Sequence, residues 1–183
     1  MSTKFAMPPL ADALPAGSFE AAPTQDEIPT IVVAAGHLVA VATALRDHPS
    51  LGFNVCLDVT AVDRFPRGPR FEVVYHFVAT QVPYTLRVKV QLAQVGEELP
   101  TLSGLWPSAN WQEREVWDLF GITFTGHPKL ERLLTPDDWE GHPLRKDYPV
   151  QIKLPVRTYE PLQLTPEEFT ANMEADRRLR RPE

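Results

Sequence analysis

Three apolar runs that follow closely on one another restrict the fold of this chain more than any other feature. Residues 53–63, 71–80 and 84–92 are rich in Val, Phe, Tyr and Leu, residue types that favour β-strands. The last run alternates apolar and polar residues, which is typical of a half-buried strand. Because the segments between the runs are short, successive strands must run antiparallel. We therefore predict a three-stranded antiparallel meander.

Helices and short strands are predicted on both sides of this meander. Ser108 or Asn110 could cap the most distinct helix, and Gly121 would end it. Together these elements predict an α+β fold, a two-layer domain whose mainly antiparallel sheet is packed by helices. The further predicted elements are a strand at 28–33, a helix that Gly36 and His37 open and that ends before Pro49, a short helical segment at 99–106, the helix at 109–120 and an extended piece at 122–124.

The chain divides into three predicted regions. Residues 1–27 hold four prolines among small residues, which favours a flexible leader. Residues 28–125 form the α+β core domain, including the helix at 109–120. Residues 126–183 are predicted to be an extended, proline-rich interaction segment with a short C-terminal helix that Thr165 could cap.

The composition excludes several classes of protein. A formal net charge of −6 at pH 7 argues against a general nucleic-acid binder, which needs a basic face. The single cysteine, Cys56, cannot close an internal disulfide or hold an iron–sulfur cluster, and we interpret it as a buried thiol. No apolar run reaches the roughly 18–20 residues that span a bilayer, and the N-terminal residues do not resemble a signal peptide. We expect a soluble, cytoplasmic chain without a direct membrane span.

Signatures of enzymes are absent from the sequence. It contains no G-x-G dinucleotide or kinase loop, no phosphate-binding P-loop and no G-x-S-x-G nucleophile motif. His127 and His142, with two aspartates between them, are the only cluster that could hold a metal ion. Each precedes a proline, which keeps it extended in a stiff turn. We favour the interpretation that both are hydrogen-bonded loop histidines.

The helix predicted at 109–120 places one carboxylate in an unusual position. Glu113 falls within the apolar arc of the helix, where an unpaired charge costs several kcal/mol. We favour a structural ion pair with Arg132 or Arg145, and the alternative is a proton-handling carboxylate with a raised pKa.

The opposite side of this helix is predicted to be polar. Arg114 and Asp118 are spaced for an i, i+4 ion pair there, and Glu115 lies on the same side. Trp111 would be exposed beside Arg114, an arrangement typical of an interface anchor.

The proline-bounded loop at 141–149 is the second informative segment. Its prolines stiffen the backbone, and Arg145 and Lys146 present positive charge next to Leu144 and Tyr148. Two alternatives are a loop exposed to solvent and a strap that covers the core of this chain. We favour docking against an acidic protein partner, because Leu144 and Tyr148 are too large and apolar to be left in water.

These residues carry a resemblance to a known family. The segment from Trp111 to Ile122 closely resembles the signature of the thirty-kilodalton-type subunit of respiratory complex I, called the C subunit in bacteria, and the resemblance continues through the loop that ends at Pro149. It covers residues 28–150. The residues that we expect to form the structural signature and subunit interface are Trp111, Glu113, Arg114, Glu115, Asp118, Gly121, His127, Pro128, Arg132, Trp139, Gly141, Pro143, Leu144, Arg145, Lys146, Asp147 and Tyr148.

The resemblance implies a non-catalytic scaffold subunit in the peripheral arm of a proton-translocating NADH:quinone oxidoreductase. The expected partners are the D subunit, which forms the quinone cavity, and the subunit that carries the terminal iron–sulfur cluster. FMN, the iron–sulfur clusters and quinone would belong to partner subunits, and this chain would hold no catalytic, cofactor or metal residue. The expected location is the cytoplasmic side of the bacterial plasma membrane, reached through the complex.

Two alternatives stay open. The chain could be the equivalent subunit of a related membrane-bound hydrogenase or of an F420H2 or ferredoxin dehydrogenase. In a different class, it could be a free-standing small enzyme that uses Glu113 with His127.

Overall fold

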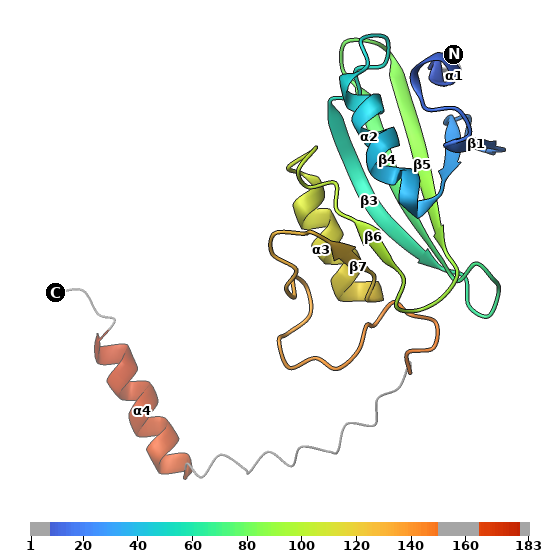
Figure 1. The fold of residues 1–183 in the computed structure, drawn as a ribbon. Coiled ribbons are helices and arrows are strands. Elements are labelled where there is room, and N and C mark those ends of the chain that lie inside the picture. The colour runs from blue at the N-terminus through green and yellow to red at the C-terminus, as the bar shows by residue number, and fades with distance from the viewer. Residues whose placement is uncertain (1–7, 150–164, 180–183) are drawn as a thin grey trace. The chain divides into compact units, whose positions relative to one another are not determined.

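The computed structural model describes residues 8–149 and 165–179 and divides the chain into two compact units (Figure 1). The first unit is Met1–Tyr148 and the second is Pro149–Glu183. In the second unit the helix α4 (Pro166–Leu179) is described. Thr165 caps it as predicted, because the Glu168 backbone N–H donates to Thr165 Oγ1 at 3.2 Å and the Thr165 N–H donates to Glu168 Oε2 at 2.9 Å.

A five-stranded sheet lies at the centre of the first unit, in the order β1-β2-β5-β4-β3. The neighbours β3, β4 and β5 pair antiparallel, which confirms the predicted meander. β2 joins β5 in parallel and β1 extends the sheet antiparallel to β2, so the sheet is mixed but mainly antiparallel. The strands are β1 (Phe19–Ala22), β2 (Thr30–Val33), β3 (Val55–Asp63), β4 (Phe71–Ala79) and β5 (Tyr84–Leu92).

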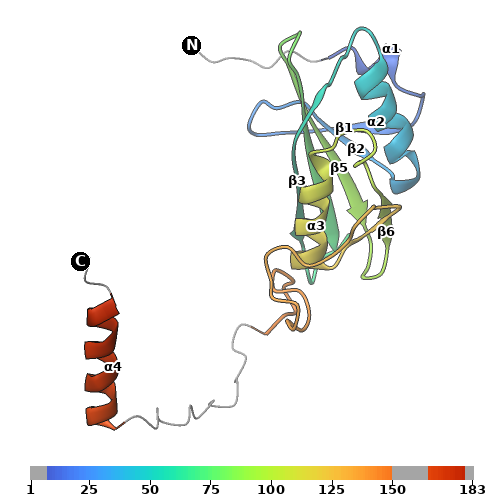
Figure 2. The same ribbon diagram turned by 90° about the vertical axis from the view of Figure 1, so that its left-hand side faces the viewer.

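Two helices cover one face of this sheet, which gives the predicted two-layer α+β fold (Figures 1 and 2). The short 3-10 turn η1 (Ala35–His37) leads into α2 (Leu38–Asp47), and α3 (Ala109–Phe120) packs against β3. Alternate residues of β4 and β5 point into the core between the layers, where Phe77 contacts the Trp106 ring with centroids 4.6 Å apart. None of the described helices is long and apolar enough to cross a membrane.

The other face of the sheet carries rows of paired charges. Buried Glu72 lies between Lys89 Nζ, at 3.0 Å, and Arg64 Nη2, at 2.7 Å. Arg87 bonds His76 and pairs with Asp26. An antiparallel sheet can leave one face to solvent in this way, since long polar side chains cover its backbone.

Part of the predicted flexible leader, residues 1–27, belongs to the folded unit, and the prediction is wrong there. The turn of helix α1 (Leu10–Ala13) and the edge strand β1 both fall within it. Leu10 and Leu14 are buried in the core, and their burial offsets the cost of ordering a proline-rich segment. Residues 1–7 of this leader lie outside the described residues.

Two local predictions around α3 are also wrong. Residues 98–106 are not helical: they contain the strand β6 (Glu98–Pro100), which pairs in parallel with β7 (Thr123–Thr125), followed by turns. Burial of Leu99 and Leu102 holds this segment extended against the core. Ser108 stands at the N-cap position of α3, but its side chain makes no capping hydrogen bond there, because its hydroxyl donates to the Cys56 carbonyl at 2.9 Å instead.

Candidate functional site

The buried carboxylate of Asp118 organises the loop that follows α3. Its side chain is fully buried and accepts hydrogen bonds from the backbone N–H groups of Leu133 at 3.0 Å, Leu134 at 2.8 Å and Thr135 at 2.9 Å. The Thr135 hydroxyl also donates to it, and Arg132 Nη1 lies 2.9 Å from Oδ1. Burial by itself would raise the pKa of Asp118, but these donors hold that pKa below its ordinary value.

Arg132 extends this cluster to the next turn of the loop. Its guanidinium donates to the carbonyl of Trp139 at 2.8 Å and to that of Gly141 at 3.2 Å, while it also pairs with Asp118. It lies over the Trp117 ring, 5.6 Å from the ring centroid. One planar, permanently charged group therefore ties two other points of the loop, Trp139 and Gly141, to Asp118 of the helix.

The C-terminal end of α3 is closed by the same loop. Gly121 ends the helix with φ +72°, as predicted, and a Cβ at this position would overlap the Arg145 guanidinium and the His142 ring. Arg145 donates to the carbonyls of Phe120 and Gly121, and His142 Nδ1 bonds the Asp118 carbonyl at 2.9 Å. A positive group at this end satisfies orphan carbonyls and complements the helix dipole.

The last part of the loop folds back on itself. The Tyr148 hydroxyl donates to the Glu140 carbonyl at 3.0 Å, and its ring stacks near Trp139 with centroids 6.4 Å apart. Gly141 has φ +80°, and a Cβ there would lie 2.8 Å from the Tyr148 ring. Glycine is required because the backbone is left-handed and an aromatic ring covers it.

The predicted ion pair between Arg114 and Asp118 does not form. Arg114 donates instead to the carbonyls of Glu131 at 3.2 Å and Arg132 at 2.9 Å. Both Arg114 and Asp118 are buried, since the loop covers the side of α3 that the sequence predicted to be exposed. The helix is therefore packed on two sides, by the sheet and by its own loop.

Large apolar side chains remain exposed around this cluster. Trp111 is exposed as predicted, at 61%, and the Arg114 guanidinium lies 5.1 Å from its ring centroid. Leu134 is 61% exposed and Leu144 is 49% exposed, although the Leu144 N–H is fixed to the Leu119 carbonyl. Of the other predicted residues, Pro143 is half-buried, and those that are exposed are Glu115, Pro128, Trp139, Gly141, Lys146 and Asp147.

Glu113 forms a separate buried cluster on the core side of α3. Its carboxylate accepts hydrogen bonds from the Thr101 hydroxyl and from the Leu102 N–H, the latter at 2.7 Å. His127 Nε2 lies 3.9 Å from Glu113 Oε2, and both side chains are 0% exposed. The predicted ion pair with Arg132 or Arg145 is wrong, because Asp118 and the end of α3 engage those two arginines.

Burial controls the protonation of this cluster. Desolvation raises the pKa of Glu113 to about 7, although the hydrogen bonds from Thr101 and Leu102 oppose the rise. Burial also raises the pKa of the Cys56 thiol to about 12, and the Glu113 charge adds to this rise. The thiol is therefore protonated and unreactive near neutral pH, as predicted for a buried apolar cysteine.

The histidines are engaged within the loop. His127 Nε2 lies 3.0 Å from the Asn110 carbonyl, and the Lys129 N–H donates to His127 Nδ1 at 3.1 Å. His142 bonds the end of α3, so the interpretation of both as hydrogen-bonded loop histidines is confirmed. Among the described residues, no group of three His, Cys, Asp or Glu side chains is placed to hold a metal ion.

Sequence reasoning missed the contacts that attach this loop to the sheet. The Lys146 N–H donates to Asp63 Oδ2 at 2.9 Å, and Arg70 pairs with Asp63 at 3.2 Å and with Asp147 at 2.7 Å. Thr101, the partner of Glu113, was missed as well. The contact between Asp63 and Lys146 joins residues 83 positions apart, and one sequence carries no local signal for such a pairing.

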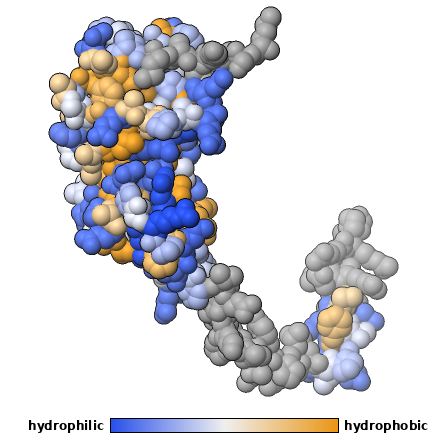
Figure 3. Space-filling model, turned by 90° about the vertical axis from the view of Figure 1, so that its right-hand side faces the viewer, coloured by the Kyte–Doolittle hydropathy of each residue, from blue (hydrophilic) through white to orange (hydrophobic). Residues whose placement is uncertain are grey.

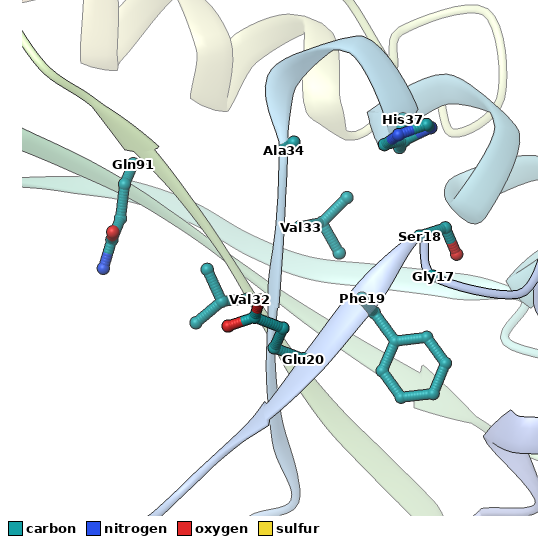
Figure 4. Close-up of a pocket in the computed structure, with 9 residues that line it drawn as sticks. All are labelled: Gly17, Ser18, Phe19, Glu20, Val32, Val33, Ala34, His37 and Gln91. Atoms are coloured by element: carbon teal, nitrogen blue, oxygen red, sulfur yellow. The ribbon is translucent and has the colours of Figure 1, made fainter.

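A hollow of about 370 Å³ lies on the other side of the unit, near β1 and η1 (Figure 4). Val32, Val33 and Ala34 line part of it, and Glu20 and His37 come to it from different elements. The Ser18 hydroxyl is already donated to the Pro15 carbonyl at 2.7 Å. This hollow lacks the convergent polar groups that mark a binding site, whereas the polar clusters around α3 converge.

Comparisons with known proteins agree on one family. Residues 31–153 match the model of the respiratory-chain NADH dehydrogenase 30 kDa subunit. The C subunit of the NADH-quinone oxidoreductase from a Roseiflexus species is 50% identical over 121 residues, which are 66% of this chain and 70% of the relative. The C subunit from Moorella thermoacetica is 48% identical over 69% of this chain and 84% of its own length. A C/D subunit from Acidiphilium cryptum is 46% identical over 72% of this chain, but the match covers 23% of that longer protein.

Solved structures agree with this result. A trypsin-resistant fragment of Nqo5 is 31% identical with a TM-score of 0.54, and the match covers 63% of this chain and 92% of the fragment. A chain of the archaeal membrane-bound sulfane sulfur reductase is 27% identical with a TM-score of 0.63, covering 74% of this chain and 79% of that chain. With its sequence signature, its α+β fold and its relatives in agreement, this chain belongs to the family of the respiratory-chain NADH dehydrogenase 30 kDa subunit.

Proposed function

We propose that this chain is a non-catalytic scaffold subunit in the peripheral arm of a proton-translocating NADH:quinone oxidoreductase. The observation that carries the proposal is the clamp between α3 and its loop, in which Asp118, Arg132 and Arg145 fix the backbone while apolar side chains stay exposed. A loop held in this way loses little entropy when it docks. Trp111, Leu134 and Leu144 supply the large apolar contacts that anchor protein interfaces.

The proposed partners are the D subunit, which forms the quinone cavity, and the subunit that carries the terminal iron–sulfur cluster. The C/D subunit of Acidiphilium cryptum supports the first partner, because fusion keeps two chains of an assembly together. FMN, iron–sulfur clusters and quinone would be held by partner subunits. The chain would lie on the cytoplasmic side of the plasma membrane, attached through the complex.

Burial argues against the alternative of a free-standing enzyme. Glu113 and His127 do lie close together, as that alternative requires, but both side chains are 0% exposed. A general acid or base must come within hydrogen-bond reach of its substrate, and no substrate atom can approach this pair without opening the core. The pair therefore fits a structural role better than a catalytic one.

The similarity to a chain of the membrane-bound sulfane sulfur reductase favours one second candidate. In that case the same exposed surface would brace a related membrane-bound complex that another electron donor feeds. The subunits that co-purify with the tagged chain distinguish the two, because only the NADH:quinone oxidoreductase contains a flavin subunit that oxidises NADH.

The test is complementation of a strain that lacks this chain. We expect the wild-type chain to restore the assembled complex on native gels, and Trp111→Ala combined with Leu144→Ala to restore much less of it. Val39→Ala, also at an exposed apolar side chain, is the matched control and should assemble normally. Turnover of NADH or quinone by the purified chain alone would contradict the scaffold role.

A further inference from the structure

A second exposed surface, which we call the hairpin patch, lies at the connection between β3 and β4. It consists of Val62 at the end of β3, Phe65 and Arg67 in the connection, and Lys146 of the loop that follows α3. Val62 is 45% exposed and Phe65 is 49% exposed. Residues 62–68 line an open hollow of about 540 Å³. In Figure 1 this connection projects from the end of the sheet beyond β3 and β4. Figure 3, a view of one face of the molecule, shows apolar residues exposed in small areas among polar ones. Single exposed apolar residues are common on protein surfaces. Exposure alone therefore does not indicate an interaction site, and the evidence for one must come from the conformation and the charge of the patch.

The tip of this connection is held in one conformation. The Phe65 N–H donates to Asp63 Oδ1 at 2.9 Å, the Arg67 N–H to the Arg64 carbonyl at 2.8 Å, and the Arg64 N–H to the Arg70 carbonyl at 2.7 Å. The Arg70 guanidinium lies 5.2 Å from the centroid of the Phe65 ring. The aromatic side chain is therefore positioned before any partner arrives, which favours binding.

The local charge is opposite to that of the whole chain. Residues 62–70 and 144–148 contain five basic and two acidic residues, whereas the chain carries a net charge of −6. The carboxylates nearby are already paired, Asp63 and Asp147 with Arg70, and Glu72 with Arg64 and Lys89. No ion pair in the described part of the chain engages the charged groups of Arg67 or Lys146. This end of the sheet is a basic surface around an exposed ring.

The hairpin patch is continuous with the loop that follows α3. Asp63 accepts the Lys146 N–H, and Arg70 bridges Asp63 and Asp147. These bonds place the hairpin directly beside Leu144 and the rest of the proposed interface, which extends that interface onto the sheet.

We propose that the hairpin patch docks an acidic segment of a neighbouring protein subunit, with Phe65 entering an apolar pocket and Arg67 and Lys146 facing carboxylates. The proposal rests on the scaffold function and extends the interface from Lys146, which belongs to the family signature, to Val62, Phe65 and Arg67, which do not. A protein partner fits better than an anionic membrane, since membrane-binding clusters typically hold about four to eight basic residues, and among the described residues of this patch only Arg67 and Lys146 are cations outside an ion pair. An exposed ring flanked by cations instead resembles a protein hot spot with a charged rim.

The test is a competition for assembly in cells that make the rest of the complex. The wild-type chain and the Phe65→Ala/Arg67→Glu variant are produced together with different tags, and their ratio in the purified complex is measured by mass spectrometry. We expect the variant to be about thirtyfold under-represented, because an interface hot spot contributes about 2 kcal/mol and each 1.4 kcal/mol is tenfold. The matched control is Val95→Ala/Lys129→Glu, which changes another exposed apolar residue and another exposed lysine. It should be incorporated like the wild type.

Two further measurements keep the result interpretable. Thermal unfolding of the purified full chains should give the same midpoint for the variant and the wild type. If the midpoints differ, the Lys146→Glu variant is used instead of Phe65→Ala/Arg67→Glu. This substitution keeps the bond to Asp63, because the backbone N–H of residue 146 is the donor. Equal incorporation of the hairpin variant and the wild type would overturn the proposal while the scaffold function stands. Failure of every chain to enter the complex would overturn both. Variant-sensitive binding to vesicles of phosphatidylcholine and phosphatidylglycerol would assign the patch to a membrane instead.

Discussion

Replacing Glu113 with glutamine tests whether this buried carboxylate is structural. The glutamine carbonyl can still accept the Leu102 N–H, and its amide can donate to Thr101, so Glu113→Gln imitates the protonated carboxyl in the same space. The variant therefore removes the ionisation but keeps both hydrogen bonds and the packing of α3.

The size of the effect follows from the pKa. Burial raises the pKa of Glu113 from 4.5 to about 7 in the folded chain. Because its folded pKa is raised, the group contributes stability below pH 4.5, and this contribution is lost as the pH rises through 7. A difference of this size corresponds to about 3 kcal/mol, since each pKa unit is about 1.36 kcal/mol. We expect Glu113→Gln to have a higher free energy of unfolding than the wild type at pH 8, but not at pH 4.

The assay is urea unfolding of the full-length chain, followed by tryptophan fluorescence across this pH range. The difference between the two proteins isolates Glu113, because other titrating groups, such as His142, are common to both. Glu113→Ala is the contrasting variant: it leaves the Leu102 N–H without a partner and opens a cavity, so it should be destabilised at every pH by roughly 2–4 kcal/mol. Identical pH dependence in the wild type and Glu113→Gln would refute the reasoning.

Three further predictions concern the clamp and the core. Asp118→Ala should lower the free energy of unfolding by roughly 3 kcal/mol, because it leaves Arg132 and three backbone N–H groups without their acceptor, and limited proteolysis should then cut the loop faster. Arg145→Ala should reduce the amount of assembled complex on native gels but not the quinone reduction per assembled complex. Arg145→Lys should restore assembly only in part, because lysine keeps the charge but loses the planar fork of the guanidinium. Normal assembly of Arg145→Ala without quinone reduction would instead indicate that Arg145 takes part in catalysis. Cys56 should resist a thiol reagent such as dithionitrobenzoate at pH 8 until urea unfolds the chain, and rapid labelling of the folded chain would contradict its burial.

Short-range patterns predicted much of the framework correctly. The meander followed from three β-rich runs with short connections, and the bounds of β5 and α3 agree with the predictions. Gly121 was predicted to end α3 because a helix commonly ends at a glycine, and its left-handed φ of +72° agrees with that role. The burial of Glu113 followed from its place in the apolar arc of the helix.

The errors arose where a segment's surroundings outweighed its own preferences. Helical periodicity can identify only the face of α3 that contacts the main core, so Arg114 and Asp118 were predicted to be exposed, although a loop covers them. Residues 98–106 have a composition that a helix could accommodate, yet pairing with β7 holds their first part extended. The prolines near the N-terminus suggested a flexible leader, but Leu10 and Leu14 had a core to enter.

The sequence by itself determined the family, the meander, the position of the signature helix and the burial of one carboxylate. Tertiary structure alone decided which donors meet Asp118 and Glu113, and that Asp63 joins the hairpin to the loop. The physical reason is distance along the chain. Periodicity and turn chemistry act over a few residues, whereas a buried carboxylate takes whichever donors the folded chain brings within hydrogen-bond reach.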